Sequence, residues 1–430
     1  MSAPLRAGAR PRDVWAWAMY DFANSGYTTV VITALFNAYF VAVVAGGRDW
    51  ATLAWTAALA LSYLAILATA PVVGAYADLR AAKKRLLALS TVGCVLFTAL
   101  LYFAQPGALW LAVVGLVLSN FFFGTGENLI AAFLPELAEA RGMGRVSGWG
   151  WGLGYLGGLF TLGLCLAWIT WAEGHGLTAS EYVPVAMLIT AAVFALASLP
   201  TLLLLPERAT PRAGRVRDAW REVARTLRAA AQFPDLRRFL AAALCYQAGV
   251  NTVITLAAIY ATQAMGFTTR QALLLILAVN VAAAAGAFLF GHAQDRFGPV
   301  RAIAWVLGGW LLTIIVAATA RTPDLFWVAA HLAGLCLGGS QSGGRALVGL
   351  FSPPSRRAEF FGFWGLAMKL SAILGPLSYG LVTWASGGDH RRALWTTALF
   401  FVAGLALLRG VRAGRGRRAA LRAERALVQE

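Results

Sequence analysis

The stretch that decides the fold is Gly291-His292-Ala293-Gln294-Asp295-Arg296-Phe297-Gly298-Pro299-Val300-Arg301. It separates two apolar runs, residues 273–290 and residues 302–320. A glycine, an aspartate four residues later and then basic residues predict a tight polar hairpin between two apolar helices. A looser copy lies 217 residues earlier, around Gly74 and Asp78. Because each copy links the second and third apolar runs of its half, the sequence predicts two related halves.

The composition places most of the chain in a membrane. Hydrophobic residues make up 59% of the 430 residues and charged residues 13%, against about 25% charged residues in a soluble domain. Twelve apolar runs reach roughly 18 residues, enough to cross about 30 Å of hydrocarbon. The first run is too long and too polar at its centre for a cleavable signal peptide. We therefore expect an all-α integral membrane protein with twelve transmembrane helices in two six-helix pseudo-repeats.

Positive charge along the chain predicts the topology. The net charge is +17, and 29 of the 36 Lys and Arg fall in the termini, the central connection and alternate loops. The positive-inside rule then places both termini in the cytoplasm. No basic soluble module is present, so we expect no nucleic-acid partner. The predicted divisions are an N-terminal bundle at 1–205, a basic cytoplasmic linker at 206–238, a C-terminal bundle at 239–411 and a basic cytoplasmic tail at 412–430.

The linker and the tail carry arginines, and we assign no catalytic or transport chemistry to them. In the linker, apolar residues recur at helical spacing and arginines fall on another face. This pattern predicts an amphipathic helix held on the inner leaflet by anionic lipid, and a solvated linker helix fits it equally well. We expect the tail, residues 409–425, to be frayed and to serve only as an anchor.

Four charged residues lie inside the apolar runs. Asp21 is in the first, Glu127 in the fourth, Arg345 in the tenth and Lys369 in the eleventh. At about 1.5 Å rise per residue, each lies roughly 8–14 Å from the predicted cytoplasmic end of its helix. A charge at that depth is costly in lipid, so these side chains should face the bundle or water. The first helix also carries Asn24, three residues after Asp21 and therefore on the same face.

The fifth helix begins with a run of glycines within residues 147–158. Pairs four residues apart, such as Gly150 and Gly154, allow a neighbouring helix to approach closely. Close packing is the simpler interpretation, and a contact that rocks during a transport cycle is the alternative.

The hairpin resembles the loop between helices two and three of the major facilitator superfamily, more closely in its second copy. Other motifs resemble the vacuole-effluxer branch, bacterial and fungal relatives of the autophagy-related vacuolar amino-acid exporter. They occupy residues 20–25, 128–136, 147–158, 205–208, 248–254, 338–341, 359–362 and 375–376. The resemblance spans nearly the whole chain. One departure is Ala248-Gly249, where the family often has Asp-Gly.

The resemblance implies that helices one, four, seven and ten line a central cavity. Candidates for binding substrate or a coupling ion are Asp21, Asn24, Glu127, Gln247, Asn251, Gln341 and Arg345. Candidates for gating are Gly74, Asp78, Gly291, Asp295, Arg296 and Lys369. The two hairpin aspartates can hold a neighbouring helix through charge-assisted hydrogen bonds, or they cap a hairpin and nothing more.

The four buried charges sum to zero, which suggests pairing. One hypothesis is that Asp21 and Glu127 face Arg345 across the cavity and exchange with substrate or a proton. The other is a static salt bridge between the halves, and Lys369 fits this second hypothesis better.

Two classes of function compete. The first is a secondary active transporter that moves a small polar solute, an amino acid or related zwitterion, by alternating access, with export as one option. Its expected partners are the solute, protons or another coupling ion, and membrane lipids. We expect a monomer, located in the cell membrane if the source is a bacterium. A transporter of lipids or amphiphiles would share the fold. The second class, a membrane-embedded enzyme, would need a catalytic or metal cluster, and the four scattered histidines form none. We expect no cofactor and no metal.

Overall fold

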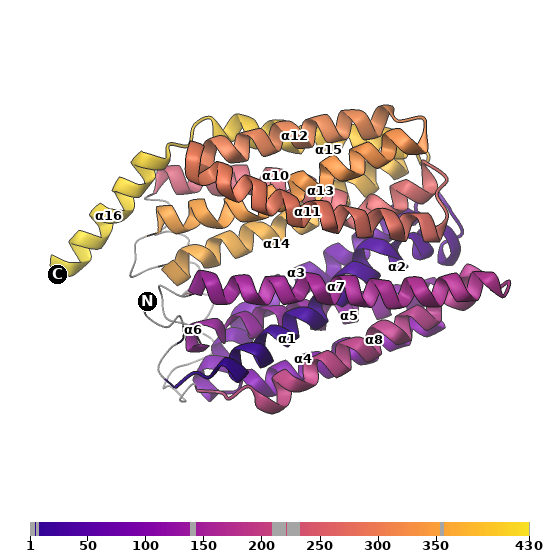
Figure 1. Ribbon diagram of the computed structural model, residues 1–430, viewed down its shortest axis with the longest axis horizontal. Helices are drawn as coiled ribbons and strands as arrows, with labels where there is room; N and C mark the ends of the chain where they lie inside the picture. The colour runs from indigo at the N-terminus through magenta and orange to yellow at the C-terminus, as the bar shows by residue number, and fades with distance from the viewer. Residues whose placement is uncertain are drawn as a thin grey trace. The chain divides into compact units, whose positions relative to one another are not determined.

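The computed structural model describes residues 5, 8–137, 143–208, 221, 233–352 and 357–429, and these residues fold into helices without a β-sheet (Figure 1). Two compact units divide the chain. Unit 1 comprises Met1–Trp220 with Thr268–Leu273, and unit 2 comprises Arg221–Phe267 with Leu274–Glu430. The amphipathic helix expected in the linker falls outside the described residues.

Unit 1 contains the first six long helices. Its elements are α1 (Pro11–Tyr27), η1 (Thr28–Ala34), α2 (Phe36–Tyr39), η2 (Phe40–Val44), α3 (Ala51–Arg80), α4 (Lys83–Leu100), η3 (Leu101–Phe103), α5 (Leu109–Ala131), α6 (Leu134–Leu137), α7 (Met143–Gly174) and α8 (Ala179–Leu204). The helix α1 packs between α7 and α8 and also contacts α5.

Unit 2 contains the other six and a terminal helix. Its elements are α10 (Pro234–Gln263), α11 (Thr269–Phe297), α12 (Pro299–Thr319), α13 (Pro323–Phe351), α14 (Arg357–Ala385), α15 (His390–Leu408) and α16 (Ala413–Gln429). The helix α10 packs against α14 and α15, as α1 does against α7 and α8. The tail is therefore not frayed over its described residues, which contradicts the sequence-based expectation, since α16 spans 17 residues.

Eleven segments of the described chain are long and apolar enough to cross a bilayer. The helix α13, 29 residues long, lies tenth among the long helices and completes the series. The predicted all-α architecture of two six-helix halves is therefore confirmed.

The first long helix is not a regular α-helix throughout. Wide π turns occupy Thr28–Ala34 and Phe40–Val44, and Leu35 between them leaves helical geometry at φ −122° and ψ −63°. Residues 28–33 read Thr-Thr-Val-Val-Ile-Thr, six β-branched side chains in a row. Such side chains crowd the preceding helical turn, so a run of them favours local widening over regular α geometry.

The two hairpins are shorter than the polar stretches that signal them. In the second copy α11 continues to Phe297, and Pro299 already begins α12, so the turn rests on Gly298 with φ 87°. In the first copy α3 ends at Arg80, and Ala81 takes φ 47°. It is the one residue other than glycine with positive φ in the described chain. A left-handed alanine costs roughly 1 kcal/mol relative to glycine.

Candidate functional site

Glycines bring α7 against α1 at the distance of backbone contact. A Cβ at Gly157 would overlap the backbone of Phe22, and one at Gly158 would press on Thr29 Oγ1 and make an ordinary contact with the Ser25 carbonyl. No larger residue fits at Gly157 without moving a helix. The close packing expected from the glycine spacing is thus present.

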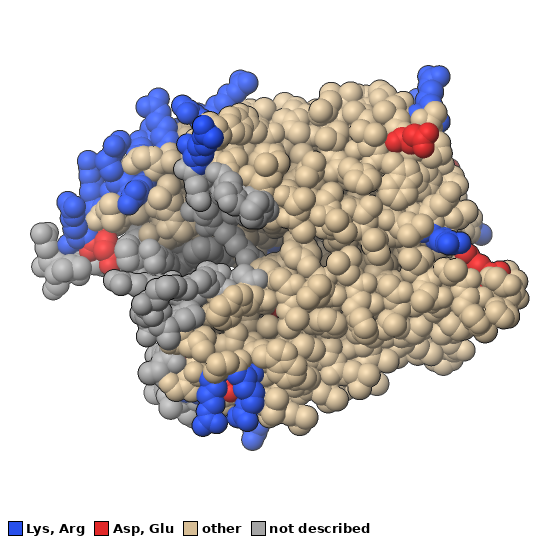
Figure 2. Space-filling model, viewed as in Figure 1, with Lys and Arg blue, Asp and Glu red and all other residues tan. Residues whose placement is uncertain are grey.

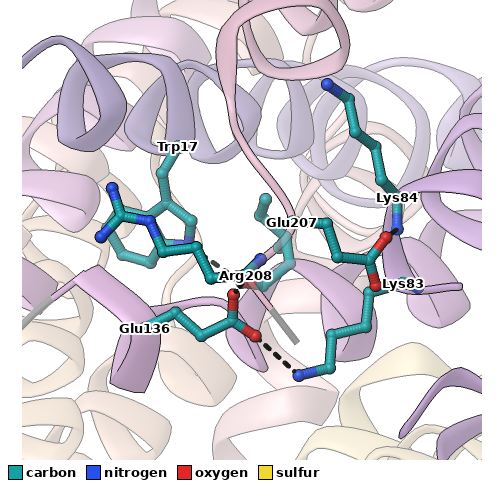
Figure 3. A network of polar contacts seen from close by, with 7 residues as sticks. Trp17, Lys83, Lys84, Glu136, Glu207 and Arg208 are labelled. Carbon is teal, nitrogen blue, oxygen red and sulfur yellow. Dashed lines mark hydrogen bonds and ion pairs between the residues drawn. The ribbon is translucent and has the colours of Figure 1, made fainter. Parts of the chain in front are cut away.

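The same interface places the first candidate residues. A Cβ at Gly150 would meet Asp21 Oδ2 and the ring of Trp17, so the aspartate of α1 lies beside the start of α7. One turn along, Asn24 is 7% exposed. Its Oδ1 is buried and has no hydrogen-bond partner among the described residues. The indole nitrogen of Trp17 donates to the Ile130 carbonyl over 2.9 Å, which ties α1 to the end of α5 (Figure 3).

Glu127 lies half-buried on α5. The preceding residue, Gly126, provides the space for the phenol oxygen of Tyr20 from α1. That oxygen also bonds to Thr91 Oγ1 of α4 at 3.0 Å. Tyr20 therefore joins α1 to both α4 and α5 in unit 1.

Unit 2 repeats the sequence of this part of α1. Residues 24–31 read Asn-Ser-Gly-Tyr-Thr-Thr-Val-Val, and residues 247–254 of α10 read Gln-Ala-Gly-Val-Asn-Thr-Val-Ile. A shift of 223 positions aligns a carboxamide with a carboxamide, glycine with glycine, threonine with threonine and valine with valine. This second repeat was not predicted, although the matching residue types at positions 24–31 and 247–254 are visible in the sequence.

The contacts repeat as well. A Cβ at Gly375 of α14 would press on the Ala248 carbonyl and on Thr252 Oγ1. These are the counterparts, under the same shift, of the Ser25 carbonyl and Thr29 Oγ1 that surround Gly158 in unit 1. The first and fifth helices of each half thus meet through the same contact.

Gln247 occupies the position that matches Asn24. It is 3% exposed, and its Oε1 is also buried without a hydrogen-bond partner in the described chain. Farther along α10, Asn251 Nδ2 donates to Ser371 Oγ of α14 over 2.9 Å. Gln341 is half-buried on α13, whereas the side chain of Arg345 lies outside the described residues.

A cluster of ion pairs at one end of unit 1 joins three segments far apart in sequence (Figure 3). Lys83 Nζ of α4 lies 2.8 Å from Glu136 Oε1 of α6, with the two side chains 10% and 13% exposed. The other oxygen of Glu136 accepts from the Arg208 backbone N–H at 3.2 Å. Glu207 accepts from the N–H groups of Lys83 and Lys84 at 2.7 and 3.2 Å. A carboxylate in this position stabilises the start of α4, where N–H groups lack helical partners.

Arg208 also ties the chain after α8 to the start of α1. Its Nη2 donates to Asp13 Oδ2 and to the Gly8 carbonyl, both at 2.8 Å. The Asp13 side chain is only 4% exposed, and it accepts in addition from the Arg10 N–H at 3.1 Å.

Unit 2 has a matching ion pair at the start of α10. Arg415 of α16 donates to both oxygens of Asp235, through Nε at 2.6 Å and Nη2 at 2.7 Å. The Arg412 N–H adds a third bond at 3.0 Å. The side-chain hydrogen bonding of Arg415 to Asp235 raises the pKa of the guanidinium above its ordinary value. Bidentate pairing of this kind fixes geometry as well as charge.

Three of the predicted gating residues have described surroundings, all outside the ion pairs given above. Gly74 has open space around its Cα, Arg296 is exposed with its guanidinium over the ring of Phe297, and Lys369 is half-buried. The side chains of Asp78 and Asp295, and the surroundings of Gly291, lie outside the described set.

The ion-pair residues in unit 1 were not predicted as functional. Lys83 belongs to the first hairpin, Glu136 to the motif at 128–136, and Glu207 with Arg208 to the motif at 205–208. The motifs were visible in sequence, but nothing in their spacing shows which acid meets which base.

Twelve long helices in two halves with repeated contacts define the class of fold, that of the major facilitator superfamily. The fold matches the bacterial homologue of the human lysosomal transporter Spinster, with a TM-score of 0.70 at 15% identity over 96% of this chain and 99% of that one. It also matches the D-xylose–proton symporter, with a TM-score of 0.67 at 17% identity over 94% and 98%. These likenesses establish the fold alone.

Comparison of the sequence identifies the family within this class. The family model for Vacuole effluxer Atg22-like proteins matches residues 41–421, and the chain belongs to this family. An uncharacterized MFS-type transporter, YxiO of Bacillus subtilis, is 27% identical over 403 residues, covering 91% of this chain and 93% of the relative. Autophagy-related protein 22-1 of Penicillium rubens is 27% identical over 218 residues, covering 47% of this chain and 36% of that protein. The family is one of effluxers and the Bacillus subtilis relative is a transporter by name, so this chain is a multi-pass membrane transporter and not an enzyme.

Proposed function

We propose that the chain moves an amino acid or a related zwitterion across the membrane by alternating access between two states. Membership of the vacuole-effluxer family supports the reaction class. The observation that carries the substrate class is the pair of buried carboxamide oxygens, Asn24 Oδ1 and Gln247 Oε1, at matched positions of the two halves.

An unpaired buried oxygen is costly. Leaving a buried acceptor unsatisfied costs about 1–3 kcal/mol, yet the first helix of each half keeps a carboxamide oxygen in this condition among the described residues. A solute that donates hydrogen bonds, such as an ammonium group, would satisfy such an acceptor during part of the cycle. Apolar cargo would leave both oxygens unpaired, which argues against a lipid substrate.

Charged residues complement the carboxamides. In unit 1, Asp21 and Glu127 offer carboxylates that attract an ammonium group or a proton. In unit 2, Asn251 and Gln341 offer amide groups, and Arg345 offers the cation that a substrate carboxylate prefers. This proposal keeps the working-site hypothesis for Asp21 and Arg345, with protons as the candidate coupling ion.

The remaining parts of the proposal concern the molecule in its membrane. The charge distribution supports both termini in the cytoplasm and, in a bacterium, insertion in the cell membrane. We assign Asp78 and Asp295 with their hairpins to the conformational cycle, and we expect the transporter to work as a monomer.

A solute panel in proteoliposomes tests the proposal. The purified chain is reconstituted and offered radiolabelled amino acids, nucleosides and sugars, with and without an imposed proton gradient. We expect uptake of amino acids above empty liposomes, and loss of that uptake in Asp21→Asn at unchanged thermal stability. Uptake of nucleosides or sugars alone would overturn the substrate class, and an unchanged Asp21→Asn would remove this residue from the site.

A further inference from the structure

The terminal helix α16 starts next to the membrane boundary. Four residues separate its first residue, Ala413, from the end of the last spanning helix at Leu408. An extended chain covers about 3.6 Å per residue, so the two points lie within about 18 Å. The start of α16 is held there by the ion pair between Arg415 and Asp235, at 2.6 and 2.7 Å.

One face of α16 is packed against unit 2. A Cβ at Gly416 would overlap the ring of Phe351 at the end of α13. One turn later Ala420 is 2% exposed. These contacts hold the helix at the ends of α10 and α13 and fix which side of it faces outward.

The outward face is basic. Arg418, Arg422 and Arg425 follow at intervals of four and three residues, which places them on one face of a helix. All three are exposed, as is the neighbouring Arg417. Figure 2 shows the resulting cluster of basic side chains over this end of the chain. Residues 413–429 include five arginines and a single acid, Glu424.

We infer that the outward face of α16 binds the phosphate headgroups of anionic phospholipids in the adjoining bilayer. Basic clusters directly after a membrane-spanning helix attract anionic lipid. The guanidinium group forms bidentate hydrogen bonds with phosphate oxygens, and it is more weakly hydrated than an ammonium. The short connection to α15 keeps this face within reach of headgroups, whereas a soluble partner would have to be recruited to it.

Lipid binding is measured on the full-length protein in a neutral detergent. The probe is fluorescent phosphatidylglycerol, with fluorescent phosphatidylcholine as the uncharged comparison. We expect preference for phosphatidylglycerol, weakening as salt is raised because the contacts are solvent-exposed charges. The variant Arg417→Gln/Arg418→Gln/Arg422→Gln/Arg425→Gln should bind phosphatidylglycerol at least about tenfold more weakly, since each arginine near the surface contributes substantially.

A matched variant removes the same charge elsewhere. It carries Arg48→Gln, Arg270→Gln, Arg321→Gln and Arg392→Gln, all on the side predicted to face away from the cytoplasm, and it should retain the preference. Equal affinity of the two variants, or no preference in the unchanged protein, would overturn the inference. If millimolar glycerol phosphate displaces the fluorescent phosphatidylglycerol as effectively as lipid does, the site binds free phosphate instead. Thermal unfolding of each variant shows that folding is intact.

Discussion

Asp13 and Arg208 are 195 residues apart in sequence, yet Arg208 Nη2 lies 2.8 Å from Asp13 Oδ2. Asp235 and Arg415 stand in the same relationship in the other half, 180 residues apart. In both cases an aspartate in the first turn of the half's first helix binds an arginine that follows its last spanning helix. In each half, one buried carboxylate therefore joins the start of the first helix to the segment after the last spanning helix.

The pair Lys83–Glu136 should contribute strongly to stability, because both side chains are nearly buried. Lys83→Met leaves an almost buried carboxylate without its cation, which costs roughly 3–5 kcal/mol. Lys83→Met with Glu136→Leu should recover most of this loss, because a well-packed apolar pair replaces buried charges at little cost. Unfolding in detergent is the measurement.

The exposed pair Asp389–Arg392 is the control for that cycle. Its side chains are 37% and 73% exposed, and exposed pairs contribute little. Arg392→Met should leave the midpoint of unfolding unchanged. A loss in the single Lys83 variant no larger than in this control would contradict the role assigned to the pair.

Replacing Ala81 by glycine should stabilise the protein. Ala81 holds φ at 47°, a conformation that glycine adopts without the Cβ clash, so Ala81→Gly should gain about 1 kcal/mol. Its neighbour Ala82 has φ −117°, and Ala82→Gly should bring no gain. If both variants shift the midpoint of unfolding equally, the left-handed conformation of Ala81 is not the cause of the gain.

Close approach of helices should make two glycines intolerant of any side chain. Gly157→Ala and Gly375→Ala would place a methyl group on the backbones of Phe22 and Ala248, at a cost of roughly 1–3 kcal/mol. Gly152→Ala and Gly163→Ala are matched controls, since nothing lies within 4 Å of either position, and they should be neutral or stabilising. Thermal unfolding of the four variants is compared, and equal losses would refute the packing argument.

Asn24→Leu should separate stability from transport. The change removes an oxygen that has no partner among the described residues, so stability should hold or rise by about 1 kcal/mol. Amino-acid uptake should fall at least about tenfold if this oxygen receives a hydrogen bond from the solute. Unchanged uptake with raised stability would assign Asn24 to packing alone.

Topology can be tested in intact cells. Single cysteines at Ala179 and Ala213 are treated with a membrane-impermeant thiol reagent in a background free of the four native cysteines. Reaction at position 179 and protection at 213 are expected from the positive-inside rule. The reverse pattern would invert the whole arrangement.

The sequence predicts the helices well because their length and apolarity are local properties. It predicts a longer second hairpin, residues 291–301, than the turn at Gly298 that the structure has, because the polar residues there continue α11 and begin α12. It does not predict that Lys83 meets Glu136, since the choice among several loop charges depends on how three helix ends converge. The composition of the tail predicts fraying. It does not reveal the ion pair between Arg415 and Asp235 that holds the start of α16. For Asp78, Asp295 and Arg345, whose side chains are not described, the sequence-based hypotheses remain predictions.

The matched surroundings of Gly158 and Gly375 bear on the history of the chain. Two halves that share a contact to a carbonyl and a threonine oxygen show the pattern that duplication of a six-helix segment would leave. Positions that still agree, such as Thr29 and Thr252, mark what both copies need in order to fold. Positions that have diverged, above all Thr28 against Asn251, mark where the copies took on separate tasks. Exchanging Thr28 and Asn251 between the two halves would show which half determines substrate selectivity.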